Sequence, residues 1–379
     1  MRIILFCIGG LLIAANVFSQ EKTYDLEISA TGDNVNNMHG GLQQGSAFLG
    51  LLDVGFSFSP NNTILRNTEF AAHFIQTVGM PASEELIGDA QIASNIEGRS
   101  KLWFYELYIR QNIHDFFLLV GMHDMNSEFC VSNQAADLIN SSFGIAPGIS
   151  MNMPVSIFPV TTSAVAAGYV RSRISLLSGF YNMNHDFTEE KEFSTDNHIF
   201  HQGSLTISEL QLRRLRGDRT VTEVKLGGFF KHCGSHYEVR PQECVSVHNY
   251  GFYLVADQSF FQNSETDESL NAFLQLNLNP THLNYVSGYF GFGMNAKGYL
   301  TKKNSDVLGF GLARVQLNQL GEKYFGKGKF ETVVELTYKQ TLFDRLTFQP
   351  DLQYIINPGG NSGLSNAIVA ILRLQVEIL

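Results

Sequence analysis

Charged and amide side chains recur at every second position within otherwise apolar stretches of this chain. The clearest example is Glu209, Gln211 and Arg213, which alternate with Leu210 and Leu212. Carboxylates and amide oxygens accept hydrogen bonds, whereas guanidinium groups and amide nitrogens donate them. Side chains of these types at this spacing can bind a polar solute or form ion pairs along one face of a structural element. The spacing therefore predicts structural elements with one polar face and one apolar face.

Motifs for catalysis or metal binding are weak by comparison. Gly288, Gly291 and Gly293 loosely resemble a nucleotide-binding loop, but no helical pattern follows them, so we interpret them as strand glycines. No serine lies in a Gly-x-Ser-x-Gly elbow, and neither Cys-x-x-Cys nor His-Glu-x-x-His spacing occurs. The one enzymatic alternative is a hydrolase whose Ser and His are brought together by the fold. We expect no enzyme, no cofactor and no metal site.

The first residues have the pattern of an export signal. A positive charge at the second position is followed by an apolar run over residues 3–17 and then by small and polar residues, as in a secretory signal peptide. We predict cleavage near Ser19 or Gln20, so that residues 1–20 are a signal peptide. A membrane anchor is the alternative, although the run is short for a membrane-spanning helix. No later apolar stretch reaches the roughly 18 residues that such a helix needs.

Composition excludes two further classes of protein, those that bind nucleic acid and those built on a disulfide framework. Charged residues make up 16% of the 379 residues, aromatic residues make up 12%, and the formal net charge is -10. No basic cluster is interleaved with aromatic residues, so we expect no nucleic-acid partner. Cys130, Cys233 and Cys244 are too few for a disulfide framework. Whether Cys233 pairs with Cys244 stays open.

The alternation of apolar and polar residues continues in segments of about 9 to 13 residues, the length of a tilted strand that crosses a bilayer. In one segment Phe56 and Phe58 share a face while Asp53 and Ser57 lie on the other. A soluble sandwich would also alternate. A membrane barrel is favoured because the polar face carries large charged groups and the apolar face is continuous. Strands in lipid have to close into a barrel, since their backbone groups find no other partners there.

The strands can then be counted. They are predicted to begin near Thr23, Ser46, Arg66, Ser100, Asp115, Val160, Arg173, Ser204, Val221, Tyr250, Leu270, Val286, Val307, Glu331, Leu346 and Ala367. Residues 21–379 are therefore predicted to form one all-β domain, a transmembrane antiparallel up-and-down β-barrel of about 16 strands, an even number. Long loops are expected on the extracellular side and short turns on the periplasmic side.

Side chains on the polar face of these strands would point into the lumen. They are Asp53, Glu106, Arg110, Glu209, Gln211, Arg213, Glu223, Lys225, Glu335, Asp351, Gln353, Arg373 and Gln375. Trp103 has the opposite parity and is predicted to join an aromatic girdle at the membrane interface. The long connection at residues 124–159 is predicted to fold inward and narrow the lumen, with packing over the mouth as the alternative. Within it Phe143 and Phe158 are expected to face the solute, unless they pack the loop.

Several stretches follow the order of one known family. Residues 121–129 are similar to a Gly-Lys-x-Asp-x-Asn-x-x-Phe pattern, with Met122 in place of Lys. Further similar stretches are Asp33-Asn34 with Gly40-Gly41, residues 88–96, residues 140–144 with Pro147, Pro154 and Pro159, residues 349–360 and residues 372–374. Together they resemble the carbohydrate-selective porins, the OprB family, over most of the mature chain. One departure is that the chain ends on Leu379, where outer-membrane chains commonly end on an aromatic residue.

The resemblance implies a barrel pore of the bacterial outer membrane that admits mono- or oligosaccharides to the periplasm by passive diffusion. Such a pore needs groups that bind weakly enough to release the solute. Glu106, Glu209, Asp351 and Arg373, near the middle of their strands, are the preferred candidates for sugar contact. The alternative is that these residues only pair across a wet wall and hold the barrel's shape.

Two other functions stay open, a nonspecific porin and a barrel used for surface binding or adhesion. The expected partners are carbohydrates in transit and outer-membrane lipid, and the protein is expected to be a monomer or a homotrimer. The acidic balance predicts a preference for cations if the charge lines the lumen. These patterns do not identify the sugar or the degree of selectivity.

Overall fold

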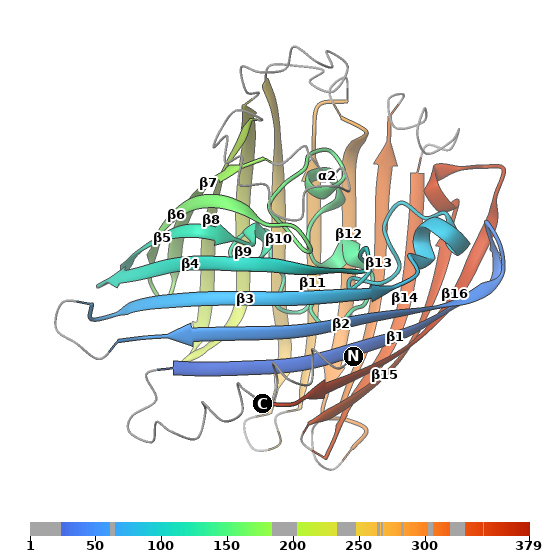
Figure 1. Cartoon of the computed structure of the whole chain (residues 1–379), viewed down its shortest axis with the longest axis horizontal. Coiled ribbons are helices and arrows are strands. Elements are labelled where there is room, and N and C mark those ends of the chain that lie inside the picture. Colours follow the sequence, from blue (N-terminus) through green and yellow to red (C-terminus); the bar gives the residue numbers. More distant parts are fainter. Residues whose placement is uncertain are drawn as a thin grey trace.

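Sixteen antiparallel strands, each paired with its neighbours in the chain, close into a barrel (Figure 1). The computed structural model describes residues 24–60, 65–183, 203–232, 248–263, 266, 268–281, 284–301, 306–318, 330–343 and 345–379. The strands are β1 (Tyr24–Gly41), β2 (Gly45–Phe58), β3 (Thr68–Gly79), β4 (Lys101–Ile113), β5 (Phe116–His123), β6 (Thr162–Val170), β7 (Ile174–Asn182), β8 (Ser204–Arg216), β9 (Arg219–His232), β10 (His248–Gln262), β11 (Ser269–Leu278), β12 (Val286–Lys297), β13 (Asp306–Leu317), β14 (Phe330–Leu342), β15 (Leu346–Ile356) and β16 (Ser365–Glu377).

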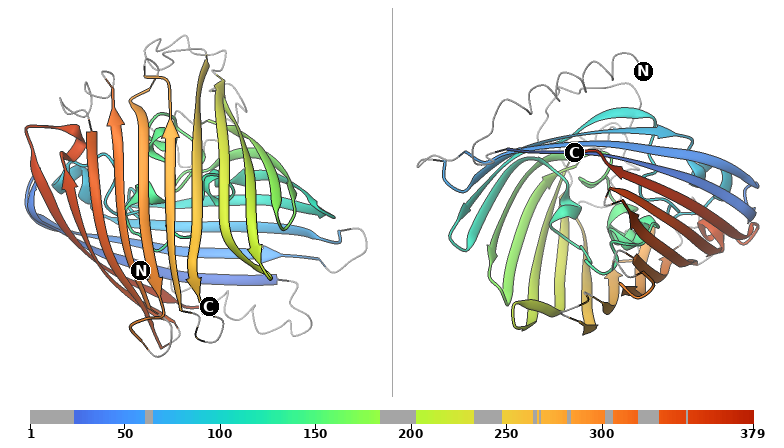
Figure 2. Two further views of the ribbon diagram at one scale, coloured as in Figure 1. Left: turned by 180° about the vertical axis from the view of Figure 1, so that it is seen from behind. Right: turned by 90° about the horizontal axis from the view of Figure 1, so that it is seen from below.

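The predicted architecture is confirmed. Every predicted strand start lies within two residues of an observed one, and the last strand pairs with the first to close the sheet. The strands are strongly tilted, so that β1 to β4 run across the opposite wall of β10 to β15 at a wide angle (Figures 1 and 2). Tilt of this kind is required when a sheet closes on itself. The predicted signal peptide and the pair Cys233 and Cys244 lie outside the described residues.

The outer face of the wall is apolar, as the alternation predicts. In β12, Phe290, Phe292 and Met294 are exposed on the outside, while Gly291 and Gly293 between them are buried on the inside. The interpretation of these glycines as strand residues is confirmed. Among the residues that the structure describes, no helix is long and apolar enough to cross a membrane.

One prediction of parity is wrong. The register between β3 and β4 shifts at Tyr105, which is an extra residue in β4. A bulge of this kind moves the residues before it to the other face. Phe104 therefore packs against the outward Phe74, with ring centroids 4.8 Å apart. The indole Nε1 of Trp103 donates instead to the hydroxyl of the fully buried Thr77 at 3.1 Å. Trp103 thus lies on the inner face and does not belong to an outer girdle.

Two long connections fold into the barrel. We call residues 80–100, between β3 and β4, inward loop A, and residues 124–161, between β5 and β6, inward loop B. Loop A contains a single helical turn, η1 (Ser83–Ile87), and loop B contains η2 (Met125–Ser127), η3 (Ser141–Phe143) and α2 (Pro147–Ser150). The view along the barrel in Figure 2 shows loop B inside the ring of strands. The inward folding predicted for residues 124–159 is confirmed, whereas that of loop A was not predicted.

Apolar side chains of loop B form a core against the inner wall. Phe129, Ile139 and Ile149 are fully buried there, together with Leu205 and Ile207 of β8. Burial of such side chains removes apolar area from water and stabilises the inward position of the loop.

The two aromatic residues that were expected to face the solute behave differently. Phe143 is only 1% exposed and meets Phe273 edge to face at 5.7 Å, so this expectation is wrong and the packing alternative holds. Phe158 contacts the ring of Tyr105 at 6.2 Å and lines a mainly apolar hollow formed by loop B itself.

Candidate functional site

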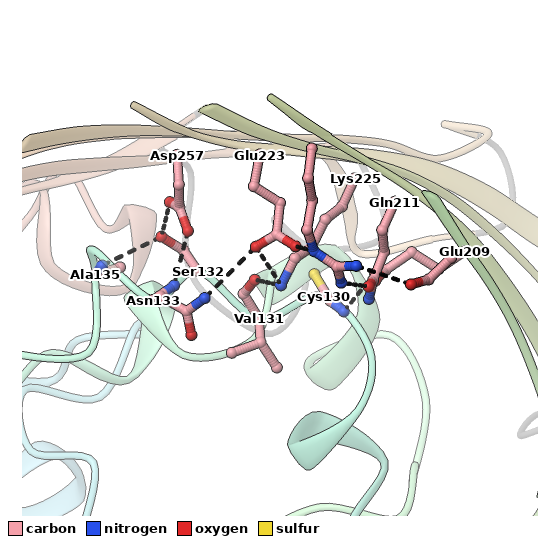
Figure 3. Close-up of polar contacts among 12 residues, drawn as sticks. Cys130, Val131, Ser132, Asn133, Ala135, Glu209, Gln211, Glu223, Lys225 and Asp257 are labelled. Carbon is pink, nitrogen blue, oxygen red and sulfur yellow. Dashed lines mark hydrogen bonds and ion pairs between the residues drawn. The ribbon is translucent and has the colours of Figure 1, made fainter. Parts of the chain in front are cut away.

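Carboxylates of the inner wall hold the backbone of loop B. The Glu209 carboxylate accepts the Cys130 N–H at 2.9 Å, and Asp257 accepts the Asn133 N–H at 2.9 Å. Glu335 accepts two N–H groups of the same loop, those of Ile139 at 2.6 Å and of Asn140 at 3.0 Å. Figure 3 shows the first two side chains reaching from their strands to the loop segment. We call Glu209, Asp257 and Glu335 the anchoring carboxylates.

The position of Glu209 depends on Gly227 of the adjacent strand β9, which is directly opposite Glu209 in the register. Tyr253 on β10 donates its hydroxyl to Glu209 at 2.8 Å, and its cross-strand partner on β9 is Gly227. A Cβ at Gly227 would lie 1.9 Å from the ring of Tyr253. The absence of a side chain at Gly227 therefore allows the Tyr253 ring to lie across β9 and meet the carboxylate.

Loop A is held at the other side of the lumen. Glu331 on β14 accepts the N–H groups of Ala90 at 2.8 Å and Gln91 at 3.0 Å. The amide of Gln353 on β15 donates to the Ala93 carbonyl at 2.8 Å. Loop A is thereby attached to strands of the C-terminal quarter of the chain.

The seam of the barrel supplies two more contacts to loop A. Ser94 donates its hydroxyl to Asp33 of β1 at 2.7 Å, and Arg373 of β16 donates to the Asn95 side chain at 2.8 Å. The two loops also bind each other, since the Asn95 N–H donates to the Ile139 carbonyl at 2.9 Å and the Ser142 hydroxyl donates to Gln91 at 2.9 Å. Together the loops form one constriction.

A polar cavity of about 350 Å³ lies between loop B and β8 to β10. Because it is lined by residues near the short turn that joins β8 and β9, it faces the periplasmic end. We call it the lumen cavity. Its lining is Ser127, Glu128, Val131, Asn133, Gln134, Gln211, Arg213, Thr220, Val221, Glu223, Lys225, Asp257 and Ser259. A second cavity of about 350 Å³ adjoins it and shares Gln134, Thr220 and Ser259.

Charges in the lumen cavity are paired. The Arg213 Nε donates to Glu223 at 2.5 Å, and the Lys225 ammonium lies 3.6 Å from the same carboxylate. Lys225 also donates to the Val131 carbonyl at 2.7 Å, which ties the wall to loop B (Figure 3). Glu128 forms an ion pair with Arg110. The cavity thus presents guanidinium, ammonium, carboxylate, amide and hydroxyl groups without a large excess of either charge.

Burial shifts the acidity of carboxyl groups in the loops. Desolvation raises the pKa of Asp124 to about 6, although the carboxylate accepts a hydrogen bond from the Tyr105 hydroxyl at 2.5 Å. Asp137 behaves in the opposite way. Burial disfavours its ionisation, but Lys297 at 3.0 Å and Lys339 at 3.2 Å outweigh burial and hold the pKa of Asp137 below its ordinary value.

The residues predicted for the site lie on the inner wall, but in different surroundings. Gln211 and Arg213 line the lumen cavity, and Arg110 reaches it through its ion pair with Glu128. The others contact the loops, one another or neighbouring wall residues; they are Asp53, Glu106, Glu209, Glu335, Asp351, Gln353 and Arg373. Their part in solute passage stays a prediction. For most of these seven, the contacts are those of residues that fix the constriction.

Sequence reasoning missed Asp257 and Tyr253. Both have the same parity as Val255, and all three are buried on the inside of β10. The signal was therefore present in the alternation of β10. Among the described residues, no group of three or more His, Cys, Asp and Glu side chains is arranged to hold a metal ion.

Known proteins share this architecture. Residues 43–378 match the family model described as carbohydrate-selective porin, OprB family. Porin B of Pseudomonas aeruginosa is 23% identical, and the match covers 94% of this chain and 87% of that protein. The structure of OprB from Pseudomonas putida at high pH is 20% identical and superposes with a TM-score of 0.82 over 94% of this chain and 95% of that one. OmpF of Salmonella typhi, solved with daunomycin, has the same fold at 10% identity, with a TM-score of 0.59 and coverage of 94% and 97%. With this match over most of its length, the chain belongs to the OprB family of carbohydrate-selective porins of the bacterial outer membrane.

Proposed function

We propose that the lumen cavity is the place where a sugar in transit binds, and that Arg213, Glu223 and Lys225 form the main contacts. The observation that carries the proposal is the Arg213–Glu223 pair, at 2.5 Å, on the open side of the constriction. A guanidinium group can donate two hydrogen bonds to neighbouring hydroxyls, and a carboxylate can accept from others. A neutral polyol fits such a paired site, because it offers donors and acceptors without disturbing the charge balance.

The neighbouring amides extend the proposed site. Asn133 and Gln134 of loop B and Gln211 of β8 also line the lumen cavity, whose volume of about 350 Å³ falls in the range of roughly 300 to 1,000 Å³ of small-molecule sites. The Arg213 side chain keeps an exposure of 19%, whereas the Glu223 side chain is buried with an exposure of 7%. Because the two side chains already bind each other, a sugar gains little by competing for them, so its binding should be weak, as passage through a pore requires.

Single-channel conductance of the purified protein in a planar bilayer tests the proposal. In the wild type, glucose and maltose should reduce the current in a saturable way. The double variant R213Q/E223Q should need roughly tenfold more sugar for the same block, the loss expected for one charge-assisted hydrogen bond.

The matched control is R66Q, which removes an exposed arginine from the turn between β2 and β3. It should leave the block unchanged. If neither sugar changed the current through the folded wild-type channel, the protein would be a nonspecific porin. If sugar blocked the current of R213Q/E223Q as strongly as that of the wild type, the sugar would not bind at the lumen cavity.

A further inference from the structure

The outer face of β8 changes from apolar to basic near its periplasmic end. Side chains on this face are Leu210, Leu212, Arg214 and Arg216 in order, while the inner face carries the buried Glu209 and Gln211. Arg214 and Arg216 are exposed. Two leucines followed by two arginines place the end of the apolar belt between Leu212 and Arg214. Arginines at such a boundary extend from the lipid region toward headgroups.

The adjacent turn between β6 and β7 adds two more exposed arginines, Arg171 and Arg173. It lies directly beside the end of β8, because the Arg213 N–H donates to the Arg173 carbonyl at 2.8 Å and the Arg213 guanidinium donates to the Arg171 carbonyl at 3.2 Å. We call Arg171, Arg173, Arg214 and Arg216 the basic rim.

Negative charge near the basic rim is smaller than the positive charge. Asp115 pairs with Arg171 at 2.7 Å, and Asp218 is exposed in the turn after β8. In the part of the chain that the structure describes, the side chains of Arg173, Arg214 and Arg216 take part in no hydrogen bond or ion pair. The rim therefore keeps an excess of positive charge that faces outward.

Aromatic residues fix the level of the rim relative to the membrane. The rings of Phe116 and Tyr169 lie 5.0 Å apart beside the rim, and the Arg171 guanidinium lies 5.8 Å from the centre of the Tyr169 ring. Aromatic side chains on the lipid face gather at the interface between the acyl chains and the headgroups. The short turns belong to the periplasmic side, so the basic rim meets the headgroups of the periplasmic leaflet.

We propose that the basic rim binds the phosphodiester of an anionic glycerophospholipid, such as phosphatidylglycerol, in the periplasmic leaflet. The planar guanidinium group binds phosphate oxygens in pairs. Arg214 and Arg216, two residues apart on a strand, are separated by roughly 6.6 Å along it, so that both can reach one phosphate from either side. The acyl chains would lie against the outward apolar residues of β7 and β8, including Leu176 and Leu212, which are 56% and 42% exposed.

The outer wall offers a matched control. Arg314 on β13 also points outward, but it lies near the end that bears the long loops and its guanidinium stacks on Phe330 at 3.8 Å. It carries the same charge on the same lipid-facing surface, at the opposite side of the membrane.

Native mass spectrometry of the detergent-purified full-length protein, titrated with phosphatidylglycerol or with zwitterionic phosphatidylethanolamine, tests the proposal. The wild type should retain phosphatidylglycerol in preference. R214Q/R216Q should weaken that retention by an order of magnitude or more, because each basic residue near an anionic surface strengthens attraction roughly fivefold. R314Q should retain the lipid as the wild type does.

Single-channel conductance, which needs a folded barrel, should be the same in all three proteins. The proposal is overturned if R214Q/R216Q retains as much phosphatidylglycerol as the wild type, or if R314Q loses it equally. It is also overturned if millimolar inorganic phosphate displaces the lipid, since the site would then recognise phosphate alone.

Discussion

Arg373 on the last strand donates two hydrogen bonds to the carboxylate of Asp33 on the first strand, at 2.8 Å and 2.7 Å. The two residues are directly opposite in the register of β1 and β16. Asp33 is fully buried and Arg373 is 8% exposed. The pair therefore bridges the seam at which the barrel closes, and the same Asp33 carboxylate also binds Ser94 of inward loop A.

Removal of one partner of this pair should weaken the barrel substantially. R373Q leaves the Asp33 carboxylate buried without its cation, and breaking a buried pair in this way costs about 3 to 5 kcal/mol of unfolding free energy. Urea unfolding of the protein folded into lipid vesicles measures this difference.

The control for the seam variant is D115N, which breaks the exposed pair of Asp115 with Arg171. Exposed pairs contribute little, so D115N should unfold like the wild type. An R373Q protein as stable as D115N would show that the seam does not depend on the pair.

Loss of an anchoring carboxylate should widen the pore. E335A removes the acceptor of the Ile139 and Asn140 N–H groups, and each buried N–H left without a partner costs about 1 to 3 kcal/mol. Loop B should then leave the inner wall part of the time. The expected result is a higher single-channel conductance and faster swelling of liposomes in large oligosaccharides. E377A, at the exposed end of β16, is the control.

Cys130 reports the same loop movement chemically. Burial raises the pKa of the Cys130 thiol to about 12, so a maleimide should react slowly with it in the native protein. In a background with C233S and C244S, E335A should accelerate the labelling of Cys130. Unchanged labelling together with unchanged conductance would contradict the anchoring role of Glu335.

Inward loop A should be less firmly packed above pH 7 than at pH 5. Burial raises the pKa of Asp89 to about 6 and that of Glu97 to about 7, and the charge of Asp89 adds to the shift of Glu97. A raised pKa of an acid means that the packed loop prefers the protonated forms. Their contribution to stability is present below the ordinary pKa near 4 and is lost as the pH rises through 6 and 7.

Hydrogen exchange of residues 83–97, corrected for intrinsic rates, measures this effect. Protection should fall about tenfold or more between pH 5 and pH 8, and D89N/E97Q should reduce that fall. Glu331, which accepts the Ala90 and Gln91 N–H groups, faces the same region and should be left intact. E84Q, which alters an exposed acid of the same loop, should behave like the wild type. A flat profile in the wild type would count against the prediction.

Two adjacent glycines of β9 should respond very differently to alanine. A Cβ at Gly227 meets the Tyr253 ring at 1.9 Å, whereas a Cβ at Gly228 meets only the edge of the Phe252 ring at 3.3 Å. G227A should force Tyr253 away from Glu209 and lower the unfolding free energy by roughly 1 to 3 kcal/mol, while G228A should be close to neutral. Urea unfolding compares the two, and equal stabilities would contradict the packing described for Tyr253.

The wall of this protein could be predicted from the sequence because each strand obeys one local rule. In β8, Glu209, Gln211 and Arg213 lie inside while Leu210 and Leu212 lie outside, as a period of two requires. The same rule placed all sixteen strand starts. It failed at Trp103 because a bulge at Tyr105 adds one residue, and a single added residue reverses every side chain before it.

The constriction could be predicted only in part, because its contacts join residues far apart in the chain. The length of residues 124–159 indicated an inward loop, but nothing local in residues 80–100 shows that Glu331 lies opposite Ala90. For the same reason, parity placed Glu209 and Arg213 on one face but could not show that Glu209 is covered by loop B while Arg213 stays open to the lumen cavity.

The separation between the inward loops and their partners sets the order in which the pore can be built. Ala93 is bound by Gln353, 260 residues later, and Ile139 by Glu335, 196 residues later. A nascent barrel that still lacks β14 to β16 already has Glu209 and Asp257 for loop B, but it lacks Glu335, Glu331 and Gln353, which hold the middle of loop B and most of loop A. During biogenesis the final strands therefore complete the constriction, and the passage reaches its full narrowness only when assembly ends.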